Sequence, residues 1–576
     1  MYIQRNKSKN KKTGKEYTAV FLCSKYREDG KVKTRVEANL SRVPEHIILG
    51  IENMLKSEGE IPVFLKDITI ENCADYGYVL VLLHLMQQLR IDQALDKSLS
   101  ETDAVRAKAM IIGKIITGGS KLCIYNWLCR ESSISKLIGL DMDNYTMDDF
   151  YYSLRQLWSH QPKIEKKWFR YHHGSTRRIY LYDLTSTYFE GTQNELAAYG
   201  YNRDGKKGKM QMCIGLLATD DGFPLRIQAF SGNTSDSATV TGQILSLKKE
   251  FGVEEIVFVG DRGMHISYHL ENDTELAENN IQFITGLTHT QIQTLLARGT
   301  IQLSLFSRDL AEVSVEGKRY ILSVNPDLEM KEKAWLDNRK ERCEALIEDV
   351  RGAWAKRCAK NHENLQKKQS SPQNGKYKNL KTELTGKDIN GYIRRVEKIV
   401  KSCGMTGYYE INLIDNQSFQ IQLNTEKFNE CCSLCGKYVL STNVPAKDMN
   451  ATQIRGKYKN LQHVEHAFRD LKSDNISIRP VYHHHEQQTR GHVLLCMFAY
   501  AIIKTMEDKL FPFLKEYNKT NKRKLAFHDL TAELNNIKTY ELNVGKGVKF
   551  NRLTELNSLQ QKILKILNID LKKMKT

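Results

Sequence analysis

The chain has 576 residues, of which 41% are hydrophobic, and a formal net charge of +18. This composition excludes a disordered polyelectrolyte and allows two to four folded units. The charge favours a polyanionic partner, most often nucleic acid, although a basic soluble protein without such a partner has the same balance. The sequence shows no apolar run of the roughly 20 residues that a membrane-spanning helix needs, and no secretory segment after Met1.

Twelve cysteines are spread along the chain, and only Cys431, Cys432 and Cys435 lie close together. A zinc site usually needs a second pair of cysteines or histidines at a suitable spacing, and none follows closely, so zinc is the less favoured interpretation of this cluster. Scattered thiols without a signal peptide are typical of a reducing compartment. We therefore expect a cytoplasmic protein.

Residues 1–65 predict a small basic β-unit. The segments 17–23 and 31–36 have the composition of strands and are joined through Glu28-Asp29-Gly30, which indicates a hairpin. The hairpin is expected either to contact DNA phosphates or to be a solvated basic surface. The following stretch, 66–170, has long apolar segments with helical spacing and predicts a helical domain, for which we expect DNA binding.

Residues 171–290 predict a mixed α/β block, the first part of a catalytic core. The pattern indicates three strands, a helix over 236–251 and two more strands, and Asp221-Gly222 favours a hairpin between the second and third strands. The predicted strands are 178–183, 209–218, 224–230, 255–260 and 281–285.

Residues 291–450 then interrupt this block and predict an α+β insertion domain. It is expected to contain a long charged helix over 330–361, a loop over 366–375, and strands at 411–423 and 437–442. The second part of the core is predicted over 451–510, and a mixed C-terminal region follows over 511–576.

Two aspartates are candidates for metal binding. Asp183 follows an apolar strand and precedes two hydroxyl residues, and Asp261 follows another strand within Gly260-Asp261-Arg262-Gly263. Each is expected at a strand end, where the sheet fixes the backbone and leaves the carboxylate oxygens free for a metal ion. The structural alternative for Asp183 is an aspartate that only starts a turn. Arg262 could orient a carboxylate or contact a phosphate.

A third acid, Glu465, lies on a predicted helix over 458–472. At about 100° per residue, one helix face carries this acid together with an aromatic ring, a leucine and two cations, which are Tyr458, Leu461, Arg469 and Lys472. Such a stripe fits a metal ligand flanked by DNA contacts. The alternative is a surface stripe in which Glu465 and Arg469 form an i,i+4 ion pair worth about 0.3–0.5 kcal/mol.

This helix resembles that of the DDE transposases of bacterial insertion sequences, in the branch with a Tyr-x2-Arg-x3-Glu-x6-Lys signature. Tyr458, Glu465 and Lys472 match the signature, whereas Leu461 stands at the arginine position. Arg469, on the same face, could partly replace that arginine.

The motifs around Asp183 and Asp261 resemble the two aspartate motifs of the same family. The resemblance implies an RNase H-like fold, an α/β core with a mixed five-stranded sheet that an insertion domain interrupts. It also implies that Asp183, Asp261 and Glu465 hold two Mg²⁺ ions, or Mn²⁺ in their place, and that these activate water to cut the element end. The freed 3′-OH would then attack target DNA, with Tyr458 and Lys472 in contact with DNA near the cleaved phosphate.

Other residues are expected to assist. Thr185 and Ser186 would support the site through hydrogen bonds. Consecutive histidines point in different directions, so we favour a structural or DNA-facing role for His483-His484-His485 over a metal site. The remaining expected DNA contacts are Arg469, Arg262 and the basic turn with Lys206, Lys207 and Lys209, for which a solvated turn is the alternative.

The leading hypothesis is a transposase that binds the terminal inverted repeats of its element and catalyses Mg²⁺-dependent cleavage and strand transfer. Its partners would be the double-stranded DNA of element ends and target, with a homodimer formed when two ends are synapsed. The alternatives are a nuclease of the same fold without strand transfer, and a decayed transposase that only binds DNA.

Overall fold

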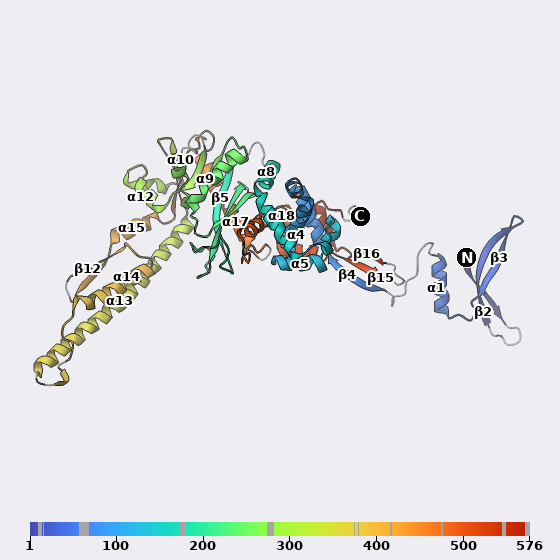
Figure 1. Cartoon of the computed structure of the whole chain (residues 1–576), viewed down its shortest axis with the longest axis horizontal. Coiled ribbons are helices and arrows are strands. Elements are labelled where there is room, and N and C mark those ends of the chain that lie inside the picture. The colour runs from blue at the N-terminus through green and yellow to red at the C-terminus, as the bar shows by residue number, and fades with distance from the viewer. Residues whose placement is uncertain are drawn as a thin grey trace. The chain divides into compact units, whose positions relative to one another are not determined.

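The computed structural model describes residues 1–9, 14, 16–56, 68–172, 179–272, 281–371, 373, 375–377, 379–414, 418–473, 476–543 and 549–570. The chain divides into two compact units, whose elements Figure 1 labels. One unit consists of residues 1–81, 129–134 and 517–576, and the other of residues 82–128 and 135–516. Within the described ranges, no helix is both long enough and apolar enough to cross a membrane.

The first unit contains two small antiparallel sheets. Its elements are β1 (Tyr2–Lys9), β2 (Glu16–Glu28), β3 (Lys31–Asn39), α1 (Glu45–Lys56), β4 (Thr69–Asp75), α19 (Phe527–Asn535), β15 (Lys538–Asn543), β16 (Lys549–Leu553) and α20 (Ser558–Ile566). The predicted hairpin is β2-β3, and β1 extends it to three strands. The second sheet, β16-β15-β4, takes β4 from the stretch predicted to be helical. Local patterns do not reveal this pairing, because it joins Asp75 to Lys538.

Helices dominate the stretch from 77 to 172, as the apolar spacing predicts. They are α2 (Gly77–Gln88), α3 (Ile91–Asp96), α4 (Glu101–Thr117), α5 (Lys121–Arg130), α6 (Ile134–Ile138), α7 (Met147–Ser159) and α8 (Gln161–His172). Helix α4 begins where the Ser100 hydroxyl accepts a hydrogen bond from the N–H of Asp103. It ends at Gly118, whose φ of 59° is a left-handed conformation that glycine adopts without strain.

A mixed sheet forms the centre of the second unit. Its strands are β5 (Ile179–Tyr188), β6 (Gln211–Thr219), β7 (Pro224–Ser231), β8 (Val257–Gly260), β9 (Gln282–Gly286), β10 (Leu310–Val315), β11 (Lys318–Val324) and β14 (Lys437–Thr442). Strands β5, β6 and β7 form an antiparallel meander, whereas β8 is parallel to β5 and β9 is parallel to β8. Arg178, predicted to open the first strand, lies outside the described residues.

The sheet is larger than the sequence predicts. The five predicted strands are present as β5 to β9, but the order β10-β11-β14-β9-β8-β5-β6-β7 makes eight strands. The three additional strands come from the range assigned to the insertion. They are antiparallel neighbours, with β14 pairing directly with β9. The prediction of a five-stranded sheet is therefore wrong, because strands from a distant part of the chain complete its edge.

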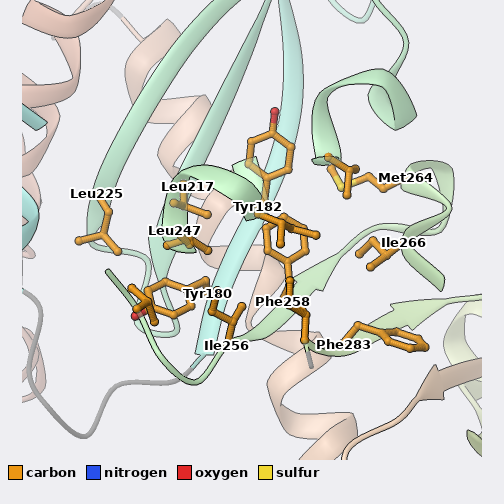
Figure 2. Close-up of a cluster of buried hydrophobic side chains, with 14 of the residues drawn as sticks. Tyr180, Tyr182, Leu217, Leu225, Leu247, Ile256, Phe258, Met264, Ile266 and Phe283 are labelled. Carbon is orange, nitrogen blue, oxygen red and sulfur yellow. The ribbon is translucent and has the colours of Figure 1, made fainter. Parts of the chain in front are cut away.

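A buried aromatic cluster supports β5 and β8. The side chains of Tyr180, Tyr182 and Phe258 are fully buried and pack together with aliphatic residues of neighbouring elements, as Figure 2 shows. Among these elements are α9 (Asp236–Leu245) and the π-helical turn that continues it, Ser246–Glu250. Because central strands are covered on both faces, their sequences are almost continuously apolar. This packing fixes the two strands that lead to Asp183 and Asp261.

The chain leaves the sheet between β11 and β14. Figure 1 shows α13 (Pro326–Ser370) and α14 (Gly386–Ser402) side by side. The loop predicted over 366–375 is wrong up to Ser370, because good helix formers such as Gln366 and Lys367 extend α13; Pro372 and Asn374 lie outside the described residues. The predicted strand 411–423 is instead a hairpin. The remaining elements are β12 (Tyr409–Leu413), β13 (Phe419–Leu423) and α15 (Thr425–Leu434).

The long helix α18 (Glu486–Thr520) packs closely against α7. A Cβ atom added to Gly491 would lie 2.0 Å from the carbonyl oxygen of Leu154. The two backbones therefore approach too closely for any side chain at this position.

Gly491→Ala is expected to lower the free energy of unfolding by about 1–3 kcal/mol, because α7 and α18 must move apart to accept the methyl group. Denaturant-induced unfolding, followed by circular dichroism, measures this loss. The control is Gly242→Ala on α9, where a Cβ atom would meet nothing within 4 Å. That change should stabilise by up to about 1 kcal/mol through helix propensity. Equal stability of the two variants would contradict the close packing of α7 and α18.

Candidate functional site

The parallel pairing of β5 and β8 places Asp183 beside Asp261. The last pair in register is Tyr182 with Gly260, so the next residue of each strand is an aspartate. Asp261 leaves the sheet and starts the 3₁₀ turn Arg262–Met264, as the sequence predicts. Asp183 does not end its strand, because β5 continues to Tyr188 and pairs Asp183 with Leu216 of β6. The strand-end prediction is thus wrong for Asp183, which instead lies where β5 loses its parallel partner.

Both aspartates open onto a cleft of about 340 Å³. Glu465 lines the same cleft, from helix α17 (Leu461–Lys472), which packs on β5. The structure therefore brings together the three acids that the sequence singles out. The residues that line the cleft are Asp183, Leu184, Thr185, Arg203, Asp236, Asp261, Glu465, Phe468, Arg469 and Lys472.

A second pocket, of about 350 Å³, shares the three acids and extends towards the outer strands of the sheet. Tyr458 and Arg262 line this pocket. All the residues of the predicted helix stripe thus face one or the other of two pockets that meet at the acids. Lys206, Lys207 and Lys209 are exposed and line neither of these pockets, and Lys209 pairs with Glu190 at 2.6 Å.

Burial and like charge act on Asp183. They raise the pKa of its carboxyl to about 7, first because the group is removed from water and then because Asp261 is close. The N–H of Leu184, which donates to Asp183 Oδ1 at 2.8 Å, and the guanidinium of Arg203 act in the opposite direction. The uncompensated negative charge at this point is one that a bound cation would stabilise.

The donor set fits a hard divalent cation. Carboxylate oxygens are the ligands that Mg²⁺ prefers, and Mg²⁺ keeps several waters, so one or two carboxylates suffice for each ion. Within the described part of the chain, no three acidic, histidine or cysteine side chains are gathered closely enough to hold one ion together. The cleft is instead lined by separate carboxylates, of which Asp261 and Asp236 lie close enough to Asp183 for their charges to raise its pKa.

The helix that carries Glu465 is not continuous with the one that carries Tyr458. Residue Asn460 ends α16 (Ala451–Lys459) and begins α17, so the single helix predicted over 458–472 is wrong. The Tyr458 hydroxyl nevertheless reaches the site and donates to Asp261 Oδ1 at 3.2 Å. Burial, followed by the charge of Asp261, raises the pKa of Tyr458, which keeps it a proton donor.

Glu465 and Arg469 form no ion pair with one another in the described structure, although both line the cleft. The surface-stripe interpretation required such a pair. Leu461 is buried, so the position at which a cation was expected carries an apolar side chain within the packing.

A network around Asp204 holds Lys472 in the cleft. Its Oδ1 atom accepts from Lys472 Nζ at 2.8 Å and from Arg479 at 2.6 Å, and the Asp204 side chain is only 3% exposed. Thr185 Oγ1 also accepts from Lys472 Nζ, at 2.8 Å. The Ser186 hydroxyl accepts from the N–H of Arg203. The two hydroxyl residues after Asp183 thus contact groups that line the cleft.

Sequence reasoning did not single out Arg203, Asp204 or Asp236 as site residues. Arg203 donates to both carboxylate oxygens of Asp236, at 2.5 and 2.8 Å, and both side chains line the cleft. The sequence places Asp236 at the start of a predicted helix, and an acid at the start of a helix after a strand is also a signal for a site. Asp204 lies in an irregular turn and offers no local signal.

The remaining candidates lie elsewhere. His483 is partly buried, and His484 and His485 are exposed. The described residues contain no metal-binding cluster of histidine and acidic side chains. The twelve cysteines are free thiols, including Cys431, Cys432 and Cys435.

Two comparisons with protein families agree with this geometry. The family described as the transposase DDE domain matches residues 174–502, which include the cleft and all eight strands of the sheet. The chain belongs to the DDE transposases. The N-terminal domain of IS1634 family transposases matches residues 6–61, which places this transposase in the IS1634 family. No curated protein matches the chain significantly.

Membership fixes the class of chemistry. A DDE transposase acts on DNA by phosphodiester hydrolysis and transesterification and uses divalent metal ions. The mixed sheet flanked by helices is consistent with the RNase H-like core of such enzymes.

The raised pKa of Asp183 predicts a pH-dependent stability. A carboxyl whose pKa rises to about 7 on folding contributes its full stability below about pH 4 and loses it as the pH rises through 7. Asp183→Asn lacks this loss, so in the presence of a chelator it should unfold at a higher temperature than the wild type at pH 8. The difference should shrink at pH 5.

Thermal unfolding with and without Mg²⁺ completes the measurement. Mg²⁺ should stabilise the wild type at pH 8 and have little effect on Asp183→Asn. Asp508→Asn, at an exposed position on α18, is the control and should follow the wild type at both pH values. If the unfolding temperature of Asp183→Asn changed with pH as that of the wild type does, the Asp183 carboxyl would not be the group whose pKa rises on folding.

Proposed function

We propose that this transposase cuts and joins DNA at the cleft formed by Asp183, Asp261 and Glu465, and that its DNA is the terminal inverted repeat of its own insertion sequence. The observation that carries the proposal is the convergence of these three acids, from β5, the end of β8 and α17, on one cleft within a transposase DDE domain. Strand transfer into target DNA follows from the same site if the freed 3′-OH replaces water.

The three acids would hold two Mg²⁺ ions, with Mn²⁺ able to replace them. Asp183 would be the acid common to both ions. It shares the cleft with Glu465, and it is close enough to Asp261 for the charge of Asp261 to raise its pKa. Bound ions supply activation of the attacking water or hydroxyl and stabilise the leaving oxygen. Tyr458 holds Asp261 through its hydroxyl, which fixes the direction of that carboxylate.

Basic residues around the cleft would receive the phosphates. Lys472 is oriented by Asp204 and Thr185, and Arg469 lies on the same helix. Arg262 follows Asp261 directly and lines the adjoining pocket. Lys206, Lys207 and Lys209 would contact DNA outside the cleft, since they are exposed.

We also assign the chain to the Tyr-Arg-Glu-Lys branch of DDE transposases. Tyr458, Glu465 and Lys472 support this, because all three reach the two pockets around the acids. Leu461 departs from the signature, and Arg469 would take over part of the missing phosphate contact. A homodimer is expected on DNA, because two element ends have to be brought together.

Asp183→Asn, Asp261→Asn and Glu465→Gln should each reduce cleavage about 1,000-fold or more, because several kcal/mol of charge stabilisation in the transition state is lost. DNA binding, measured by a gel shift, should remain. The assay uses labelled DNA from the boundaries of the element and Mg²⁺. Asp508→Asn removes an exposed carboxylate of α18 and should cleave like the wild type. Normal cleavage by any of the three variants would remove that residue from the site.

A target plasmid in the same reaction tests strand transfer. Joined products, absent in the three variants, would establish transposition of the element ends. Nicks without joining would instead support a nuclease, and binding without cleavage by the wild-type chain would support a decayed enzyme.

A further inference from the structure

A second polar cavity lies in the same unit as the acidic cleft. It has a volume of about 360 Å³ and is formed by the end of α4, the start of α5, α7, α18 and the segment that follows α17. Its charged and titratable lining is almost entirely basic. We call it the lysine pocket and define it by Lys114, Ser120, Lys121, Arg479, His483 and His492.

Two lysines of this pocket are buried without an acidic partner. Lys114 and Lys121 are 3% and 5% exposed, and neither forms an ion pair within the described ranges of the chain. Lys114 Nζ donates to the carbonyl oxygens of Gly119 at 2.7 Å and of Ser477 at 3.2 Å. Lys121 Nζ lies 3.1 Å from His492 Nδ1. A buried cation without a counter-charge is unfavourable, and an anion bound in the pocket would supply the missing charge.

The neighbouring groups agree with this charge balance. Burial and the charge of Lys114 lower the pKa of Lys121 to about 7, and burial together with the two lysines lowers the pKa of His483 to about 3. An anion in the pocket would oppose these effects and favour the charged form of Lys121. A metal cation, in contrast, would meet two ammonium groups.

The start of α5 adds a feature that is common in phosphate-binding sites, the amino end of a helix. The Ser120 hydroxyl accepts from the N–H of Cys123, so the pocket also faces the amino end of a helix, where free N–H groups and the helix dipole favour anions. Arg479 adds a guanidinium, a group well matched to phosphate oxygens.

A single carboxylate connects the lysine pocket to the acidic cleft. Asp204 pairs with Arg479 on the side of the lysine pocket and with Lys472 on the side of the cleft. The lysine pocket is therefore next to the cleft, and a DNA strand bound in the cleft would be close enough for one of its phosphates to enter the pocket. The occupant is therefore expected to be part of the same DNA molecule.

We propose that the lysine pocket binds a phosphate group of the DNA strand that occupies the acidic cleft. The proposal rests on the proposed position of DNA in that cleft, but it concerns binding and requires no cleavage. It assigns the buried lysines a role that the reaction at the three acids does not use.

Ser120→Asp is the sharpest test, with Ser120→Asn as its matched control. Both aspartate and asparagine replace serine well as a helix cap, and they differ only in charge. Ser120→Asp should bind boundary DNA about tenfold more weakly and unfold at a higher temperature without DNA, because its carboxylate takes the place of the phosphate. Ser120→Asn should bind within about twofold of the wild type. Equal binding by the two variants would overturn the proposal.

Lys121→Met provides a second test that does not depend on the cap. It should weaken DNA binding and leave the unfolding temperature equal or higher. It should also lower the slope of log Kd against log salt by about one, which corresponds to one counterion fewer released on binding. Lys108→Met, which removes an α4 lysine paired with Asp96, is the control for loss of one charge. A lower unfolding temperature with an unchanged salt slope would show that Lys121 is only structural and would overturn the proposal.

All binding is measured in a chelator, so that failure of the proposed catalytic residues cannot affect the result. Inorganic phosphate, added without DNA, distinguishes the source of the anion. Stabilisation of the wild type by free phosphate together with normal DNA affinity of Lys121→Met would identify a site for a free anion and would overturn the assignment to DNA. Loss of DNA affinity in Lys121→Met and Ser120→Asp, with intact binding in the control Lys108→Met, would support it.

Discussion

The parallel register of β5 and β8 is the constraint on which the site depends. It places two aspartates side by side at the point where one strand continues and the other turns away. The aromatic cluster beneath them opposes a shift of either strand, because Tyr182 and Phe258 are fully buried and closely packed within it. The fold thus holds two like charges together that would separate in a flexible chain.

The surroundings of the aspartates follow from this enforced repulsion. Tyr458 donates to Asp261, Arg203 holds Asp236, and Lys472 is kept nearby by the nearly buried carboxylate of Asp204. Both acids and cations therefore line the cleft. A cleft of this kind can accept both divalent cations and DNA phosphates, which a uniformly acidic or uniformly basic surface could not.

Local signals in the sequence are sufficient for strands β5 to β9, and they single out the three acids that line the cleft, but they do not give the context of each acid. The hydroxyl residues after Asp183 were compatible with a turn, yet Thr185 and Thr187 are β-branched and continue the strand. Asn460 separates α16 from α17, although the residues on both sides of it have helical spacing. Because Asn460 itself has helical φ and ψ, it does not indicate a break more clearly than any other polar residue would.

The long-range contacts could not be predicted from one sequence. Strand β14 joins the hairpin β10-β11 to the sheet by pairing with β11 and β9, each across more than a hundred residues of intervening chain, and β4 pairs with a strand near the C-terminus. The Lys472–Asp204 contact is of the same kind, since nothing in either segment identifies the other. Periodicity describes which face of an element is buried, whereas pairing is decided by the whole fold.

One connection in the sheet has a further consequence for how such a protein can change in evolution. Strands β11 and β14 are neighbours, and just beyond them the N–H of Asn325 donates to the carbonyl oxygen of Gly436 at 2.8 Å. The long helical excursion, residues 325–436, therefore begins and ends at the same edge of the sheet, where its two ends are joined by a hydrogen bond. Segments of that kind can be lengthened, shortened or exchanged at little cost in loop closure. The excursion is thus free to diversify while the strands that hold the aspartates stay unchanged.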